Sequence, residues 1–490
     1  MTETTTETEA VTLRNYVGGE WREVSGGTLD SRNPATGELL GRVPLSAAAD
    51  VDAAVVAARA AFPAWADTSP IIRARALFAL REVLTAHREE IARLVTMDMG
   101  KTFDDAYGEV GRGIESVEAA CGVPHTLKGQ TLEGVARNVD VESFRQPLGV
   151  IAAITPFNFP AMIPLWFLPF AIACGNTFIL KPSEQDPLAS RRIVELIDAV
   201  EEIPAGVVNL VHGAHDAVNG ILDHPGIDAI SFVGKASTAR YVAHRGAEHG
   251  KRVQALGGAK NSLVVMPDAD PKLTAAGVTS SAFGAAGQRC LAGSVLLLVG
   301  TPQEQDRSLQ IVVDASQALQ TGDGADPQTD VCPLVSPAAR EYAETAVAEA
   351  LAGGASLVLD GRRDGGAAGA ELGPTIVDDL DGDHPITRDE IFGPVLGVVR
   401  APDLDGALEW MNESRYGNAA MIFTSDGGHA REFRRRVQAG MVGVNIGVAA
   451  PVAWFPFSGW KDSIDGDLHA NGDDAVTFYT RSKVVTSRWR

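Results

Sequence analysis

The segment between residues 150 and 247 constrains the fold more than any other part of the chain, because β-rich runs alternate there with segments of helical apolar period. The β-rich runs lie at Val150–Ile154, 177–180, 207–210 and Ala229–Val233, and the helical segments lie at 161–174, 188–200, 216–222 and 238–247. Alternation of this kind is typical of a parallel sheet that carries helices on both faces. We therefore expect an α/β fold.

Further elements are predicted on both sides of this segment. Helical apolar spacing covers residues 47–62, 70–99 and 103–120, and the second of these helices is expected to start at Ser69-Pro70 and to stop at Gly100. A second α/β block runs from about residue 261 to residue 453, with strands predicted at 262–265, 295–299, Ser356–Leu359 and 395–399. A chain of 490 residues is longer than a single hydrophobic core usually accommodates, so two or three domains are expected.

Two segments depart from this order. Residues 127–147 contain two polar-alternating pieces, Gln130–Ala136 and 139–145, which predict an exposed hairpin, and residues 476–490 alternate in the same way. A lone ribbon of this kind is marginally stable in water. We therefore expect these pieces to pair across a subunit interface in a homo-oligomer.

Charge and hydropathy exclude several kinds of partner. A formal net charge of -21 argues against nucleic acid and anionic membranes, which both require clustered Lys and Arg. The most apolar window, residues 159–174, is too short to span a membrane and holds three prolines, so it predicts a buried helix. The first ten residues, MTETTTETEA, are acidic, unlike a signal peptide, and are expected to form a frayed tail.

The cysteines and histidines give no sign of a metal or disulfide framework. The four cysteines, Cys121, Cys174, Cys290 and Cys332, are widely spaced and form no CxxC pair, and the ten histidines are scattered without an HExxH motif. No metal site is predicted, and a reducing cytoplasm fits this cysteine usage best.

Residues suited to ligand binding follow four predicted strands. They are Thr155-Pro156-Phe157-Asn158, Lys181-Pro182-Ser183-Glu184, Gly234-Lys235 and, after a further strand at 252–255, Leu256-Gly257-Gly258. In an open parallel sheet, ligands bind beyond the carboxyl ends of the strands, so these residues are expected to line one crevice. The GxGxxG fingerprint is missing, so the phosphates of any bound dinucleotide would meet only the Gly234 turn and the following helix start.

Cys290 is the candidate nucleophile. It follows Arg289 and the small-residue run Gly284-Ala285-Ala286-Gly287, and such a run lets a substrate approach the backbone. A neighbouring arginine and a helix end favour the thiolate, which suits covalent catalysis, whereas inert packing is the alternative for a lone cysteine.

Gly100-Lys101-Thr102 resembles the end of a P-loop motif. Val95 stands where the first glycine of that motif belongs, so the match is set aside.

Six motifs, ITPFNFP, GNTFILKPSE, SFVGK, QALGGAKN, GQRC and EIFGPV, occur in this order along nearly the whole chain. Together they resemble the aldehyde dehydrogenase superfamily, and FSGWKDS and FYTRSKVVTSRW resemble its CoA-acylating methylmalonate-semialdehyde dehydrogenase branch. The resemblance implies a Rossmann-type NAD-binding domain (1–126 and 148–257), an α/β catalytic domain (258–455) and a β-ribbon oligomerisation element (127–147 and 470–490).

The resemblance also implies site residues. Cys290 would attack the aldehyde, and Asn158 together with the Cys290 N–H would stabilise the developing oxyanion. Lys181 and Glu184 would hold the adenosine ribose, where a carboxylate favours NAD over NADP, and Glu390 would hold the nicotinamide ribose. The other implied cofactor-binding residues are Thr155, Phe157, Gln185, Gly234, Lys235 and Gly257. Lys235 replaces the usual hydroxyl residue, and contact with the pyrophosphate and exposure to solvent both remain open.

Substrate and acceptor follow from the same resemblance. Arg112 and Arg289 would hold a substrate carboxylate through bidentate guanidinium contacts. Ala255 stands where hydrolytic relatives carry a glutamate that activates water, so coenzyme A becomes the expected acyl acceptor, unless another base substitutes.

The implied activity is NAD-dependent oxidation of methylmalonate or malonate semialdehyde, with decarboxylation and transfer to CoA giving propionyl-CoA or acetyl-CoA. A hydrolytic semialdehyde dehydrogenase and a non-catalytic NAD-binding structural protein are the alternatives. The preferred semialdehyde, the pathway (valine, inositol or β-alanine breakdown) and the choice between dimer and tetramer stay open.

Overall fold

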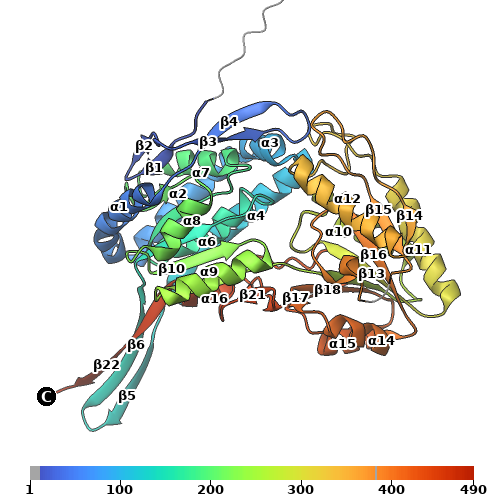
Figure 1. Ribbon diagram of the computed structural model, residues 1–490. Coiled ribbons are helices and arrows are strands. Elements are labelled where there is room, and N and C mark those ends of the chain that lie inside the picture. Colours follow the sequence, from blue (N-terminus) through green and yellow to red (C-terminus); the bar gives the residue numbers. More distant parts are fainter. Residues whose placement is uncertain (1–10, 381–382) are drawn as a thin grey trace, which may run out of the picture.

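A computed structural model describes residues 11–380 and 383–490, so the predicted tail at residues 1–10 lies outside the described residues. Two lobes, each built on one large sheet, lie side by side, and a thin β-ribbon extends from the first lobe (Figure 1). This architecture confirms the predicted α/β fold.

The first lobe contains an eight-stranded sheet. Its order is β2 (Glu20–Arg22), β1 (Asn15–Val17), β9 (Val208–Leu210), β8 (Thr177–Lys181), β7 (Val150–Ile154), β10 (Ala229–Val233), β11 (Arg252–Leu256) and β21 (Ile464–Asp465). The five strands from β9 to β11 are parallel, as predicted, and the flanking strands are antiparallel.

Helices cover both faces of this sheet. The side chains of β7 alternate: Val150, Ala152 and Ile154 join an apolar cluster with α1 (Ala48–Asp67), α8 (His215–Asp223) and α9 (Ala236–Glu248). Ile151 and Ala153 face the opposite cluster, which contains α6 (Met162–Ala173) and α7 (Leu188–Asp198). Every residue of α6 is buried, which confirms the predicted buried helix. In the described part of the chain, no helix is both long enough and apolar enough to cross a membrane.

The N-terminal helices differ from the prediction at two points. The helix predicted over 70–99 is two helices, α2 (Pro70–Ala86) and α3 (Arg88–Met99), because the backbone leaves the helical conformation at His87 although the apolar spacing continues. Helix α1 passes through Pro63 to Asp67, where the buried Trp65 donates from Nε1 to the Ile172 carbonyl (3.0 Å) and anchors the last turn. The Ser69 cap and the left-handed Gly100 stop are confirmed, and α4 (Phe103–Cys121) matches its predicted range.

The second lobe contains a seven-stranded sheet. Its order is β14 (Ser356–Leu359), β15 (Thr375–Asp378), β16 (Val395–Ala401), β13 (Gly293–Val299), β12 (Asn261–Val265), β18 (Ala419–Phe423) and β19 (Met441–Val444). Strands β15, β18 and β19 were not predicted; β15 and β19 have four residues each, and β19 contains a glycine. The helices of this lobe are α10 (Pro271–Phe283), α11 (Pro302–Gln317), α12 (Pro337–Ala352), α13 (Pro385–Arg388), α14 (Leu404–Asn412) and α15 (Gly427–Arg436).

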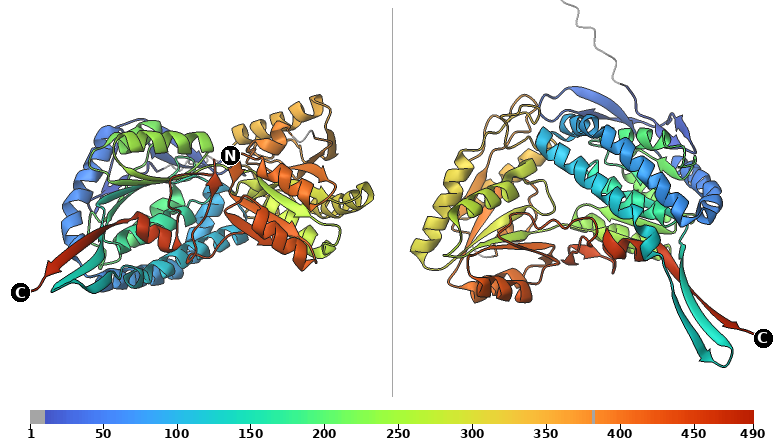
Figure 2. Two further views of the ribbon diagram at one scale, coloured as in Figure 1. Left: turned by 90° about the horizontal axis from the view of Figure 1, so that it is seen from below. Right: turned by 180° about the vertical axis from the view of Figure 1, so that it is seen from behind.

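The ribbon is a three-stranded antiparallel sheet. Strand β6 (Val139–Pro147) lies between β5 (Gln130–Ala136) and β22 (Thr480–Arg488), and Figure 2 shows the ribbon standing away from the lobes with the C-terminus near its tip. The two predicted pieces therefore pair within one chain. Residues at the start of the predicted C-terminal piece instead form the helix α16 (Gly472–Phe478).

Short elements complete the chain. They are α5 (Val123–Thr126), the pair β3 (Thr28–Arg32) and β4 (Leu39–Pro44), and the pair β17 (Tyr416–Gly417) and β20 (Trp460–Lys461).

Candidate active site

The predicted crevice residues gather at one edge of the eight-stranded sheet. Strands β8, β7, β10 and β11 are parallel neighbours, so the segments that follow them emerge side by side. Lys181 is buried and forms an ion pair with Glu184 (Nζ–Oε2 2.7 Å). Nearby, the Thr155 hydroxyl is buried without a hydrogen-bond partner, and the Thr155 N–H donates to the Lys181 carbonyl (3.0 Å).

These groups fit a ribose. Glu184 keeps about a third of its side chain exposed, and its carboxylate can accept hydrogen bonds from vicinal hydroxyls while repelling a phosphate. The unpartnered Thr155 hydroxyl adds a further polar contact. Gln185 and Lys235 are exposed, and Phe157 packs edge-on against Phe392 with ring centroids 5.7 Å apart.

Two glycines in the crevice are required by close approach. A Cβ on Gly234 would lie 2.5 Å from the Phe232 ring, and a Cβ on Gly257 would lie 3.0 Å from the Asp462 carbonyl oxygen. Both positions therefore exclude larger residues and keep the strand ends open.

Glu390 reaches the same strand ends from the second lobe. Its Oε1 accepts from the Ala259 N–H (3.0 Å), and its Oε2 would lie only 2.6 Å from a Cβ placed on Gly258. Burial raises the pKa of Glu390 to about 7, although the Ala259 N–H and the nearby Lys260 act in the opposite direction.

The loop that carries Cys290 has an unusual backbone. After α10, Ala285, Ala286 and Gly287 all adopt left-handed conformations (φ 49°, 52° and 71°), so Cys290 follows a strained turn and not a helix end. A Cβ on Gly287 would lie 2.3 Å from the Gly393 carbonyl oxygen, which explains the glycine. Asp105 on α4 supports the turn by accepting from the Ala285 N–H (3.2 Å).

Two asparagines fix the Cys290 backbone. The side-chain amides of Asn261 and Asn418 both donate to the Cys290 carbonyl (2.9 and 2.8 Å). Burial raises the pKa of the Cys290 thiol to about 12, Glu390 adds to this effect, and Arg289 opposes it only weakly. Arg289 therefore acts in the predicted direction, but burial outweighs its effect on the pKa of the thiol, and Cys290 follows a turn and not the predicted helix end.

Cys290 opens onto a cavity of about 440 Å³ between the lobes. Arg112 and Arg289 line it together with Trp166 and Phe457. Arg289 forms an ion pair with Asp105 (2.7 Å), whereas Arg112 makes only long contacts, 3.4 Å each, with the carbonyls of Ala450 and Pro451. Among the described residues Arg112 makes no ion pair, so it is the arginine with charge available for an acidic substrate.

Asn158 is buried, with 3% of its surface exposed. Its Nδ2 donates to the Gln288 carbonyl (2.8 Å), two residues before Cys290, and its own carbonyl accepts from Lys101 Nζ (2.7 Å). The side-chain amide has a second N–H, so the contact with Gln288 leaves one donor for an oxygen bound at Cys290.

Comparison with known proteins identifies the family. The model of the aldehyde dehydrogenase family matches residues 21–485. Malonate-semialdehyde dehydrogenase 1 of Geobacillus kaustophilus is 50% identical over 487 residues, which cover 99% of each chain. The chain belongs to the aldehyde dehydrogenase family. This confirms the predicted superfamily and enzyme class.

Solved structures of two relatives superpose on this aldehyde dehydrogenase over nearly its whole length. Methylmalonate-semialdehyde dehydrogenase from Oceanimonas doudoroffii matches with a TM-score of 0.95 at 42% identity, covering 98% of this chain and 99% of that chain. A putative methylmalonate-semialdehyde dehydrogenase from Sinorhizobium meliloti, complexed with NAD, matches with a TM-score of 0.96 at 42% identity, covering 99% of each chain.

Sequence reasoning missed several residues of this aldehyde dehydrogenase site. Lys101 was dismissed with the false P-loop match, and Glu109, Gln288, Asn261 and Asn418 were not considered. All five fix backbone groups of other segments, through contacts between residues distant in sequence. The only available signal was their polar character next to recognised motifs, as for Asn261 in QALGGAKN and Gln288 in GQRC.

Ala255 is fully buried near the end of β11. It pairs with Phe232 and Asp465 and belongs to the apolar cluster that includes Ile154 and Ala239. Its methyl group supplies no acid or base.

In the described part of the chain, no group of three or more His, Cys, Asp and Glu residues is placed to hold a metal ion.

Proposed function

We propose that this protein is an NAD-dependent, CoA-acylating dehydrogenase of malonate semialdehyde and methylmalonate semialdehyde. The observation that carries the proposal is that Cys290 and Arg112 line the same cavity, and that Arg112 is a cation without a carboxylate partner among the described residues. A semialdehyde of this class offers an aldehyde to the thiol and a carboxylate to the arginine. The names of the relatives, at 50% and 42% identity, support the same substrate class.

The residues perform the oxidation in a defined order. The Cys290 thiol gives its proton to water as the sulfur bonds to the aldehyde carbon, and the π electrons of the carbonyl pass to its oxygen. Asn158 Nδ2 and the Cys290 N–H stabilise the resulting oxyanion. Lys181, Glu184, Thr155 and Glu390 would hold NAD, which would supply the hydride acceptor. Loss of hydride leaves an acyl group on the Cys290 sulfur as a thioester.

The second half of the reaction needs a nucleophile. Alanine at 255 cannot take a proton from water, whereas a thiol ionises at much lower pH than water and needs less assistance. We therefore infer that coenzyme A attacks the thioester. A carboxylate β to the thioester carbonyl can leave as carbon dioxide, and the delocalised carbanion that remains takes a proton from water. The expected products are therefore acetyl-CoA from malonate semialdehyde and propionyl-CoA from methylmalonate semialdehyde.

Product analysis with and without CoA tests this proposal. With malonate semialdehyde, NAD and CoA, we expect continuous NADH formation and acetyl-CoA by mass spectrometry. Without CoA, a burst of about one NADH per active site should be followed by slow turnover, because the acyl-enzyme accumulates. Equal turnover to free acid without CoA would favour the hydrolytic alternative, and no NADH under any condition would favour a non-catalytic NAD-binding protein.

Arg112→Ala should change substrate discrimination. We expect kcat/KM for malonate semialdehyde to fall by about 100-fold, since a charge-assisted contact is lost, while kcat/KM for propanal changes less than about threefold. Arg340→Ala, which removes an arginine ion-paired with Glu344 on α12, provides the control. If Arg112→Ala slows both aldehydes equally, Arg112 does not bind the carboxylate.

Glu390 predicts a pH dependence of NAD binding. Its ionised form would accept from ribose hydroxyls, and burial raises its pKa to about 7, so NAD binding should strengthen as pH rises through about 7 and weaken as pH falls below it. If only the ionised form binds, the Kd rises by up to about tenfold per pH unit in acid. Isothermal titration between pH 5.5 and 8.5 measures this, and Glu390→Gln should bind NAD weakly with a flat profile.

We also propose that the ribbon joins subunits of a homo-oligomer. Strand β5 is exposed along its whole length, and Leu132, Val484 and Trp489 expose 65%, 65% and 59% of their surfaces. Apolar side chains on a projecting ribbon are typical of surfaces covered by another chain. Light scattering should give a dimer or tetramer, and Leu132→Glu should reduce the mass.

Domain organisation and location complete the proposal. The two large sheets support an NAD-binding domain at 1–126 and 148–257, a catalytic domain at 258–455, and a ribbon at 127–147 and 470–490. All four cysteines are unpaired, which supports a cytoplasmic location.

A further inference from the structure

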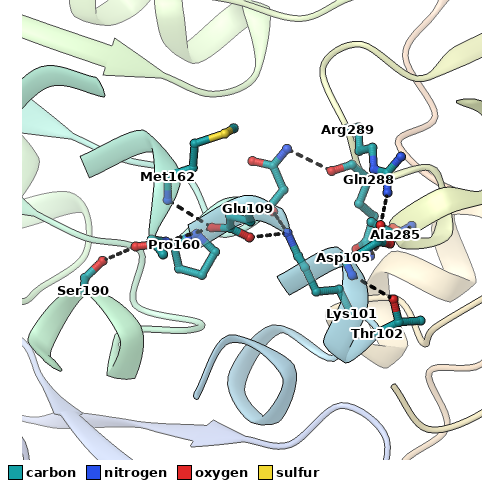
Figure 3. A network of polar contacts seen from close by, with 12 residues as sticks. Lys101, Thr102, Asp105, Glu109, Pro160, Met162, Ser190, Ala285, Gln288 and Arg289 are labelled. Carbon is teal, nitrogen blue, oxygen red and sulfur yellow. Dashed lines mark hydrogen bonds and ion pairs between the residues drawn. The ribbon is translucent and has the colours of Figure 1, made fainter. Parts of the chain in front are cut away.

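A buried ion pair stands behind the cysteine cavity. Lys101, which follows α3, and Glu109 on α4 expose 1% and 0% of their side chains, and Lys101 Nζ lies 2.6 Å from Glu109 Oε2. Figure 3 shows the two side chains directed at each other, with Gln288 and Arg289 of the cysteine loop across from Lys101. Both residues also line the cavity.

The pair holds both ends of the segment that contains Asn158. Lys101 Nζ donates to the Asn158 carbonyl (2.7 Å) and lies 4.1 Å from the centre of the Phe159 ring. Glu109 Oε1 accepts from the N–H groups of Ala161 and Met162 (2.9 and 3.1 Å), at the start of α6. One ion pair therefore fixes the backbone from Asn158 to Met162.

Lys101 is itself held in place by the backbone around it. Gly100 ends α3 in a left-handed conformation (φ 91°). Gly324 packs so closely that a Cβ there would lie 2.3 Å from the Gly100 carbonyl oxygen and 2.5 Å from that of Lys101. The Phe103 N–H donates to the Gly324 carbonyl (3.1 Å). These contacts give the lysine one direction in which to extend.

The network continues from Asn158 to the nucleophile. Asn158 Nδ2 donates to the Gln288 carbonyl, and the Gln288 side chain is held by the Val335 N–H (3.0 Å) and the Ala285 carbonyl (3.2 Å). A shift of the Asn158 backbone would therefore move its amide relative to the Cys290 loop. Misplacement of a catalytic group by about 1 Å can cost about 100-fold in rate.

We propose that Lys101, oriented by Glu109, is a positioning residue that holds the Asn158 amide in place for the oxyanion formed at Cys290. This inference rests on the proposed role of Asn158. Stability alone is a poor explanation for the pair, because apolar residues of similar volume commonly replace a buried ion pair without loss. The contacts of Lys101 instead lead to the backbone of the residue whose side chain must be placed.

A double-mutant cycle tests the inference. Lys101→Met should lower the rate of the first NADH burst by about 10- to 100-fold and leave the Kd for NAD unchanged. In an Asn158→Ala background, Lys101→Met should cost less than about threefold, because the group it positions is gone. Losses that multiply in the double variant would overturn the inference.

The matched control is Lys251→Met. Lys251 is also a buried lysine, and its Nζ donates to the carbonyls of His224 and Ile227, away from the cavity. This variant should lose stability and keep the burst rate. If it slows the burst as much as Lys101→Met, the effect of Lys101 is one of general stability and the inference is wrong.

A second variant covers the case in which Lys101→Met fails to fold because Glu109 is left unpaired. The pair Lys101→Met/Glu109→Gln removes both charges and keeps a side-chain oxygen that can accept from the Ala161 and Met162 N–H groups. This variant should fold, as judged by circular dichroism, and show the same burst defect. The experiment distinguishes failure of the proposed oxyanion role of Asn158 from failure of the positioning role of Lys101. If Asn158→Ala leaves the burst unchanged, the oxyanion role of Asn158 fails and the inference with it, whereas a slow Asn158→Ala with a normal Lys101→Met overturns the Lys101 inference alone.

Discussion

Cys290→Ala is expected to lower aldehyde-dependent NADH formation by at least about a thousandfold, because no other group can form the thioester. Cys290→Ser should be almost as inactive, since a serine hydroxyl at this site has no base to activate it. Mass spectrometry of the wild type mixed with NAD and semialdehyde, without CoA, should show an acyl adduct on the peptide that contains Cys290. An active Cys290→Ser variant would remove the covalent mechanism.

Cys121→Ala is the matched control for this loss. Cys121 ends α4 and is 7% exposed, and burial raises the pKa of its thiol to about 11, so it is a protonated core cysteine. Its replacement should leave kcat unchanged and cost some stability through the small cavity created. If Cys121→Ala lowers activity as much as Cys290→Ala, the loss in Cys290→Ala could result from disruption of the fold and would not identify the nucleophile.

The fold could be predicted because its main signal is local. The parallel strands β7, β8 and β10 are mostly apolar runs of five residues, each followed by a helical pattern, and such a run is visible without knowledge of its neighbours. The break at His87 and the continuation through Pro63 were missed because tertiary contacts, such as the hydrogen bond from Trp65 to Ile172, decide them. Short strands such as β19 carry too few residues to show a period.

The site residues likewise divide into those that local sequence patterns reveal and those that only the folded structure reveals. The motif residues at the strand ends were found because topology places the ends of parallel neighbours at one edge. Lys101, Glu109 and Gln288 were missed because their roles depend on hydrogen bonds to backbone groups 47 to 57 residues away in the sequence. No rule of sequence spacing connects such residues. The raised pKa of the Cys290 thiol was also missed, since its causes, burial and the nearby Glu390, exist only in the folded chain.

Asn158→Ala is expected to lower kcat for acyl-enzyme formation by about 100- to 1000-fold, the usual cost of losing one oxyanion donor. The Kd for NAD should stay unchanged, because Lys181, Glu184 and Glu390 remain. Stopped-flow measurement of the first NADH turnover isolates this step from CoA transfer. A burst at the wild-type rate would show that Asn158 does not stabilise the oxyanion.

Asn176→Ala separates that chemical role from structural loss. Asn176 is as buried as Asn158, but it makes four hydrogen bonds to backbone groups, from Nδ2 to the carbonyls of Ala171 and Tyr479 and to Oδ1 from the N–H groups of Leu148 and Gly149. Its replacement should cost about 1–3 kcal/mol of stability per buried polar group left unpaired and leave kcat near the wild-type value. Since Asn158 has fewer fixed partners and lies against the Cys290 loop, its variant should show the reverse: a small change in melting temperature and a large loss of rate. Similar rate losses in both variants would indicate disruption of the sheet edge and not loss of an oxyanion donor.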